Sequence, residues 1–205
     1  MEQTSMRDDF RAGRMKPLYE AMLQQAIAAG AQWAPATVYG RLHRSGEESV
    51  IELRDGARIA TRFIVAADGA RSRVARDLRL DENSRFITGV ENVYVSQTPA
   101  EPRFDVWIDP ALAPGYLPWG VEDGEEMHVG VGGNPRRFDP SDALRLFETR
   151  LRREHRLTAA APIERRGGLI PVNGVLRHIG NDRGLLIGDA AGAVSPLTAG
   201  GLDAC

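Results

Sequence analysis

The residues best placed to bind a ligand follow a short apolar run late in the chain. Leu185, Leu186 and Ile187 predict a buried strand that ends at Gly188-Asp189, and the carboxyl end of a strand is where an open α/β sheet presents its ligand contacts. An aspartate there can accept hydrogen bonds from the hydroxyls of a sugar or a sugar alcohol. The residues that follow are small, so that a bulky ligand could approach the backbone closely: Ala190, Ala191, Gly192 and Ala193.

A helix is predicted to begin directly after this stretch. Pro196 is suited to a helix start, and Gly200 and Gly201 fall in the opening turn. Leu202, the next residue, is also a candidate ligand contact. Free backbone N–H groups at the start of a helix favour negative charge, such as a pyrophosphate. Taken alone, the same residues would also describe an ordinary Gly/Ala-rich turn.

A second candidate stretch lies earlier in the chain. The continuous apolar run at 63–67 predicts a strand buried on both faces, and it stops at Asp68-Gly69. Residues 73–78 predict a short helix with Ser72 as its N-cap. Gly69 permits a tight turn, while Asp68 can hold neighbouring backbone amides. A lone Asp-Gly turn does not indicate a ligand site. The order strand, Asp-Gly, loop and helix is more informative than the dipeptide.

Together, the two stretches resemble the FAD-dependent monooxygenase and geranylgeranyl reductase superfamily. The Gly-Asp stretch of that family (GDAAG, then Pro, then a Gly-containing helix start) is matched by Gly188, Asp189, Ala190, Ala191, Gly192, Pro196 and Gly201. Its Asp-Gly stretch (ADGxxSxVAR) is matched by Asp68, Gly69, Ser72, Val74, Ala75 and Arg76. The reductase branch looks closest, because it reads PLTGEGI where this chain reads PLTAGGL; Ala199 and Gly200 depart from it.

Two weaker similarities accompany these stretches. Family members carry an Arg near the FAD before a helix, and Arg14 occupies that place. The stretch at 114–133 resembles the reductase branch's GYxWxFP strand and returning VGVG strand, which implies that Tyr116 and Trp119 line the substrate cavity over the flavin. Either aromatic residue could equally be part of the sheet's core. The WxWxIP stretch of the related halogenases is absent from the sequence.

The resemblance implies an FAD-dependent oxidoreductase, of reductase or monooxygenase type, that acts on a hydrophobic small molecule. FAD would be the redox centre and NAD(P)H the electron donor. Since redox chemistry of this kind belongs to the cofactor, no side chain needs to act as an acid or base, and no catalytic residue is assigned. Two alternatives stay open, a nucleotide-binding module without redox activity and an inactive remnant.

The G-x-G-x-x-G motif that opens FAD-binding folds of this kind does not occur in the sequence. We therefore expect an N-terminal segment of roughly a hundred residues, and a C-terminal portion, to be missing from this chain. We also expect the isolated chain to retain FAD weakly or not at all.

Composition limits the partners and the kinds of site that the chain can have. The 205 residues carry a net charge of −2, which gives no reason to expect a nucleic-acid partner. The single cysteine, Cys205, excludes an internal disulfide framework and a cysteine-based metal cluster, and no metal site is predicted. No apolar run is long enough to span a bilayer. A cytoplasmic location is expected, while peripheral membrane contact and the oligomeric state are left open.

The elements that position these residues predict an α/β (α+β) fold. It consists of a partial, glutathione-reductase-like Rossmann FAD-binding domain with a β-rich substrate domain inserted. The FAD-binding part covers 1–84 and returns at 176–205, and the insert covers 85–175. Helices are expected at 15–29 and 140–154, the second with Ser141 as its cap, and residues 159–168 read as a linker.

Overall fold

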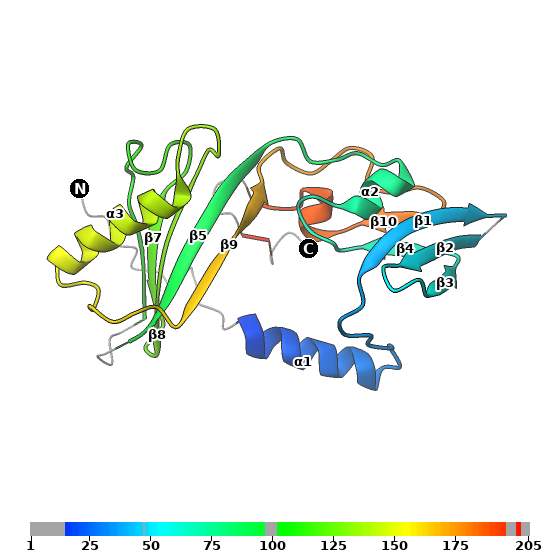
Figure 1. The fold of residues 1–205 in the computed structure, drawn as a ribbon, viewed down its shortest axis with the longest axis horizontal. Helices are drawn as coiled ribbons and strands as arrows, with labels where there is room; N and C mark the ends of the chain where they lie inside the picture. Colours follow the sequence, from blue (N-terminus) through cyan, green and yellow to red (C-terminus); the bar gives the residue numbers. More distant parts are fainter. Residues whose placement is uncertain (1–14, 47, 97–101, 196–199, 202–205) are drawn as a thin grey trace.

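The structure is a computed structural model that describes residues 15–46, 48–96, 102–195 and 200–201. Its parts follow one another along the long axis of the molecule (Figure 1). A sheet covered by the helix α3 lies at one end, and a small three-stranded sheet at the other. The elements that carry the two candidate stretches lie between them.

The three-stranded antiparallel sheet contains β1 (Tyr39–Ser45), β2 (Glu48–Leu53) and β3 (Arg58–Thr61), in that order. After β3 the chain leaves this sheet, and the strand predicted at 63–67 belongs to another one. The next strand, β4 (Ile64–Ala66), pairs in parallel with β10 (Gly184–Leu186). The predicted burial of β4 on both faces is wrong for Val65, whose side chain is 56% exposed.

A helix and a single helical turn follow the strands of this parallel pair. The helix α2 (Arg73–Leu78) comes after β4, and the 3-10 turn η1 (Gly188–Ala191) comes after β10. Ser72 caps α2 as predicted, because its hydroxyl accepts the Ala75 N–H at 2.9 Å. These four elements enclose one hydrophobic core, whose buried residues are Ile64, Ala66, Val74, Ala75, Leu78, Leu186, Ala190, Ala191 and Ala193.

The second core lies between a five-stranded antiparallel sheet and α3 (Pro140–Arg153). The sheet has the order β6-β7-β8-β5-β9, and its strands are β5 (Phe86–Val95), β6 (Arg103–Val106), β7 (Pro118–Glu122), β8 (Glu126–Gly133) and β9 (Glu164–Pro171). The face under α3 contains Tyr94, Val129 and Val131. Since side chains alternate along a strand, their neighbours in sequence belong to the opposite face.

Two details of this part correct the sequence-based expectations. Asp139 caps α3 instead of Ser141, since its carboxylate accepts the Asp142 N–H at 2.9 Å. The predicted linker at 159–168 contains the first half of β9, which pairs with β5 at the edge of the sheet. Its Glu-Arg-Arg-Gly-Gly start is exposed and does not alternate, so the strand has no periodic hydrophobic signal.

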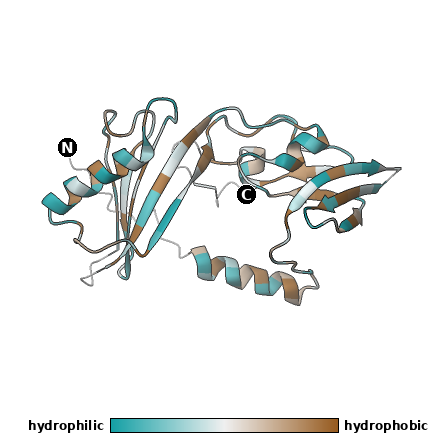
Figure 2. Cartoon of the chain, viewed as in Figure 1, coloured by the Kyte–Doolittle hydropathy of each residue, from teal (hydrophilic) through white to brown (hydrophobic). Residues whose placement is uncertain are grey.

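The helix α1 (Met15–Ala28) stands apart from both cores (Figure 1). It fits the predicted helix, and its end follows the expected pattern, with Gly30 in the left-handed region at φ +98°. Figure 2 shows hydrophobic residues along it, yet none of its residues is buried. Among the described residues, no helix combines the length and the apolar character that a membrane span needs.

Candidate functional site

The parallel pairing of β4 with β10 brings the two candidate stretches together. Leu186 pairs with Ala66, and the Ile187 N–H donates to the Ala66 carbonyl at 3.0 Å. Because both strands run in the same direction, both end at the same edge, where Asp68 follows one and Asp189 the other. Such an edge is where open α/β sheets bind ligands.

The Asp68 carboxylate is used within the protein. It accepts hydrogen bonds from the Ser72 hydroxyl at 2.5 Å, from the Arg73 N–H at 2.8 Å and from the Val74 N–H at 3.2 Å. It therefore holds the amides at the start of α2, as the sequence suggested. Gly69 has φ +84°, and a Cβ built on it would meet nothing within 4 Å, so that space beside the turn is open.

The Asp189 carboxyl group is in a different situation. It lies in the first turn of η1 and is half-buried, and this burial raises its pKa above the usual value. Within the described part of the chain, no donor forms a hydrogen bond with this carboxylate. Gly201 lies beside it, since a Cβ on Gly201 would be 3.6 Å from Asp189 Oδ1. A partly desolvated acceptor without a donor at this edge fits a hydroxyl-bearing ligand.

Gly188, Ala190 and Gly192 shape the turn around Asp189. Gly188 and Gly192 both have positive φ, +54° and +69°, and Ala190 is buried in the core. A Cβ on Gly192 would come within 2.5 Å of the Gly174 carbonyl oxygen. Glycine is therefore required at this position for packing as well as for backbone conformation.

Asn83 connects the two stretches, and sequence reasoning missed it. Its Nδ2 donates to the Ala70 carbonyl at 3.1 Å and to the Asp189 carbonyl at 2.8 Å. Its Oδ1 accepts from Asn173 Nδ2 at 3.0 Å. One asparagine thus fixes the Asp-Gly turn against the Gly-Asp turn. No motif contains it, so the sequence offered no signal for this role.

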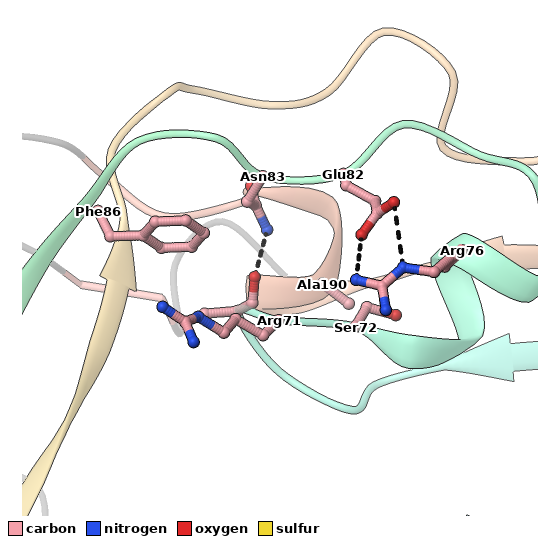
Figure 3. A pocket seen from close by; sticks show the side chains of 8 residues that line it. Arg71, Ser72, Arg76, Glu82, Asn83, Phe86 and Ala190 are labelled. Atoms are coloured by element: carbon pink, nitrogen blue, oxygen red, sulfur yellow. Dashed lines mark hydrogen bonds and ion pairs between the residues drawn. The ribbon is translucent and has the colours of Figure 1, made fainter. Parts of the chain in front are cut away.

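A cavity of about 250 Å³ lies where the two turns meet (Figure 3). Figure 3 shows the bond from Asn83 to Ala70 and the pair of Arg76 with Glu82, whose atoms lie 2.8 Å apart. The Arg71 guanidinium lies 5.8 Å from the centre of the Phe86 ring. The lining residues are Ala70, Arg71, Ser72, Arg76, Glu82, Asn83, Phe86 and Ala190.

The two aromatic residues lie on the five-stranded sheet, on the face opposite α3. A Cβ on Gly132 would be 2.8 Å from the Tyr116 ring and 3.5 Å from the Trp119 ring, so both rings meet over this glycine. Burial raises the pKa of Tyr116. The structure thus places Tyr116 and Trp119 side by side, while Arg14, Pro196 and Leu202 fall outside the described residues.

Comparison with known proteins shows the family to which the sequence is similar. The sequence profile of the FAD binding domain family matches residues 15–204. The digeranylgeranylglycerophospholipid reductase of Methanocaldococcus jannaschii is 30% identical over 185 residues, which cover 87% of this chain and 47% of that protein. The menaquinone reductase of Mycobacterium tuberculosis strain H37Rv is 31% identical over 179 residues, with 79% and 43% covered. The chain spans less than half the length of these two relatives.

Two solved structures have a similar fold. A geranylgeranyl bacteriochlorophyll reductase-like protein from Thermoplasma acidophilum gives a TM-score of 0.77 at 20% identity, covering 95% of this chain and 53% of that protein. A flavin-dependent halogenase from Xanthomonas campestris gives 0.70 at 17% identity, covering 91% and 38%. At these identities the likeness concerns the fold alone, and it confirms the predicted fold class.

Proposed function

Since the chain belongs to the FAD binding domain family, we propose that it works as an FAD-dependent oxidoreductase of the reductase type on a hydrophobic lipid. The observation that carries the proposal is the shared edge of β4 and β10. There Asp189 presents a half-buried carboxylate without a donor among the described residues, next to Gly201 and across from the Asp-Gly turn.

The residues at this edge fit FAD in distinct ways. Asp189 would accept hydrogen bonds from the hydroxyls of the sugar-alcohol chain, which would offset the cost of its burial. Gly69 would allow a close approach, because space beside it is open. Asn83 would hold both turns at a fixed spacing. We extend the same proposal to Arg14, Pro196 and Leu202 on the basis of the sequence motifs alone.

Bound FAD would supply the redox chemistry, and we propose NAD(P)H as the electron donor. The chain's own contribution is to orient the cofactor and to present an apolar surface to the substrate. Tyr116 and Trp119 supply that surface in the proposal, within a substrate domain at 85–175 between FAD-binding segments at 1–84 and 176–205. A cytoplasmic location is part of the same proposal.

Two features favour a lipid as the substrate and reduction as the reaction. The relatives at 30% identity and above are named as reductases of digeranylgeranylglycerophospholipid and of menaquinone. The aromatic pair over Gly132 offers a flat apolar surface of the kind that suits a hydrocarbon chain.

The test is an anaerobic turnover experiment. The intact protein, loaded with FAD, is reduced with NADPH or NADH and then mixed with a lipid that bears an unsaturated polyprenyl chain. A reductase gives a product heavier by two hydrogens per reduced double bond, without oxygen. A product that forms only in air and carries an added oxygen atom would indicate a monooxygenase instead. Failure to bind or reduce FAD would contradict the proposal and favour a nucleotide-binding module.

A further inference from the structure

The Trp119 indole lies flat across a glycine of the neighbouring strand. Trp119 on β7 pairs with Gly130 on β8, and a Cβ built on Gly130 would come within 2.1 Å of the indole carbons. The ring thus occupies the space where any other side chain would begin. Gly89 on β5 also lies beneath the indole, since a Cβ built on it would be 3.7 Å from the far edge of the same ring.

The polar edge of the indole reaches a carboxylate two strands away. Gly130 pairs with Trp119 on one side and with Glu91 on the other, so the three residues form one row across the sheet. Trp119 Nε1–H donates to Glu91 Oε2 at 2.8 Å. The glycine between them is what allows the ring to cross the strand.

The second oxygen of Glu91 is held by basic groups. His128 Nδ1 lies 3.2 Å from Glu91 Oε1, and Arg166 Nη1 lies 3.5 Å from it. Burial alone would raise the pKa of Glu91, but the hydrogen bonds from His128 and Trp119 outweigh it and keep this pKa below its usual value. The hydrogen bond to Glu91 in turn raises the pKa of His128. The indole therefore donates to an ionised, anchored carboxylate.

Glu91, at one end of this row, lines a cavity on the same face of the sheet. The cavity has a volume of about 560 Å³. Its wall combines Val121 and the first turn of α1 with the charged or polar side chains of Glu91, Asp123, Glu126, His128, Glu164 and Arg166. Small-molecule sites typically fall in this size range. A ring fixed beside such a space is placed to contact a ligand, whereas a ring free to rotate would lose entropy on binding.

We infer that Glu91 is a positioning residue that fixes the Trp119 indole flat on the sheet, as a preformed contact surface for the apolar chain of the substrate. The inference rests on the proposed function for the identity of the substrate. The position of the ring can be tested without any substrate.

The first test follows the indole N–H signals of the intact protein by ¹⁵N NMR, with the Trp119 signal assigned from the Trp119→Phe variant. Glu91→Ala should shift the Trp119 signal strongly and leave the Trp33 and Trp107 signals in place. Glu91→Gln should shift it less, because the amide oxygen still accepts the bond. The matched control is Glu154→Gln at the C-cap of α3, a carboxylate with an Arg150 partner at 2.9 Å, which should move none of the three signals.

The second test is a double-mutant cycle on the reaction with a polyprenyl lipid. Glu91→Ala should raise the KM for the lipid about tenfold, the usual scale for one hydrogen bond to a charged group. Reduction of the flavin by NAD(P)H should be unchanged. Glu91→Gln should recover most of the loss. In the Trp119→Phe background, Glu91→Ala should not raise the KM for the lipid any further.

The outcomes separate the inference from the function on which it rests. An unmoved Trp119 signal in Glu91→Ala would overturn the inference whatever the activity. An equal loss in both backgrounds would also overturn it, since Glu91 would then act independently of the ring. A wild-type protein that reduces no polyprenyl lipid would contradict the proposed function. The NMR result would still decide whether Glu91 positions Trp119.

Discussion

Replacing Asp189 should separate ligand binding from folding. Asp189→Ala removes both side-chain acceptors at this position, and Asp189→Asn keeps one oxygen but removes the charge. A hydrogen bond to a charged group contributes about 1.5–3 kcal/mol, so loss of one bond should weaken FAD binding about 10- to 100-fold in the Ala variant. The Asn variant should lose less. Titration followed by flavin fluorescence measures both affinities.

The same variants should leave the protein without FAD as stable as before, or more stable. Burial raises the pKa of Asp189 in the folded state, so as the pH rises the unfolded chain releases this proton first. The contribution of Asp189 to stability is therefore complete below the pKa of the unfolded chain, about 3.9, and is lost as the pH rises through the folded pKa. At neutral pH, Asp189→Asn should raise the melting temperature, and the gain should shrink on acidification.

Thermal unfolding without FAD, at neutral pH and near pH 4, checks the sign. Asp182→Asn is the matched control, because this nearby aspartate is 77% exposed and should change neither stability nor affinity. An Asn variant of Asp189 that melts lower at neutral pH and binds FAD normally would refute the reasoning, since Asp189 would then be a structural residue.

Three further variants test the scaffold of the site. Asp68→Ala should destabilise the protein by about 1–2 kcal/mol in urea unfolding, because it leaves the amides at the start of α2 without their acceptor; an unchanged midpoint would contradict this. Gly192→Ala should lower the free energy of unfolding by more than about 1 kcal/mol, because its Cβ would meet a carbonyl oxygen at 2.5 Å and its φ is positive. The control variant Gly168→Ala, whose Cβ would have open space around it, should have little effect in the same melting assay. Asn83→Ala should cost about 1–3 kcal/mol and also weaken FAD binding, since it breaks the bonds between the two turns; normal affinity with lowered stability would limit Asn83 to folding.

Local signals made much of the fold predictable. The helix at 15–29 and the cap at Ser72 follow rules that operate within one or two turns of chain. The β-rich character expected from residue 85 onward rests on apolar runs separated by turn residues, and β5, β6, β7 and β8 lie in this region. Each of these elements carries its own pattern, so one sequence was enough to find it.

What sequence reasoning missed depends on partners far along the chain. The strand β9 exists because β5 offers it an edge, and its exposed polar start shows no strand period. Asn83 matters only because Ala70 and Asp189 come within reach of its amide. His128 belongs to no motif in the sequence, and nothing local indicates that Glu91 lies 3.2 Å away on the next strand. Such roles are set by register, which single-residue patterns do not encode.

The two motif aspartates have different environments at the shared edge of β4 and β10. Asp68 has three donors within the protein, and with its bonds satisfied it stabilises the start of α2. Asp189 has none among the described residues, and burial disfavours its charged form. Such a carboxylate does not stabilise the folded chain, since an unsatisfied buried acceptor costs free energy. A ligand that supplies the missing donors would account for this cost. The contrast therefore supports our proposal that Asp189 contacts the ligand, while Asp68 stabilises the start of α2.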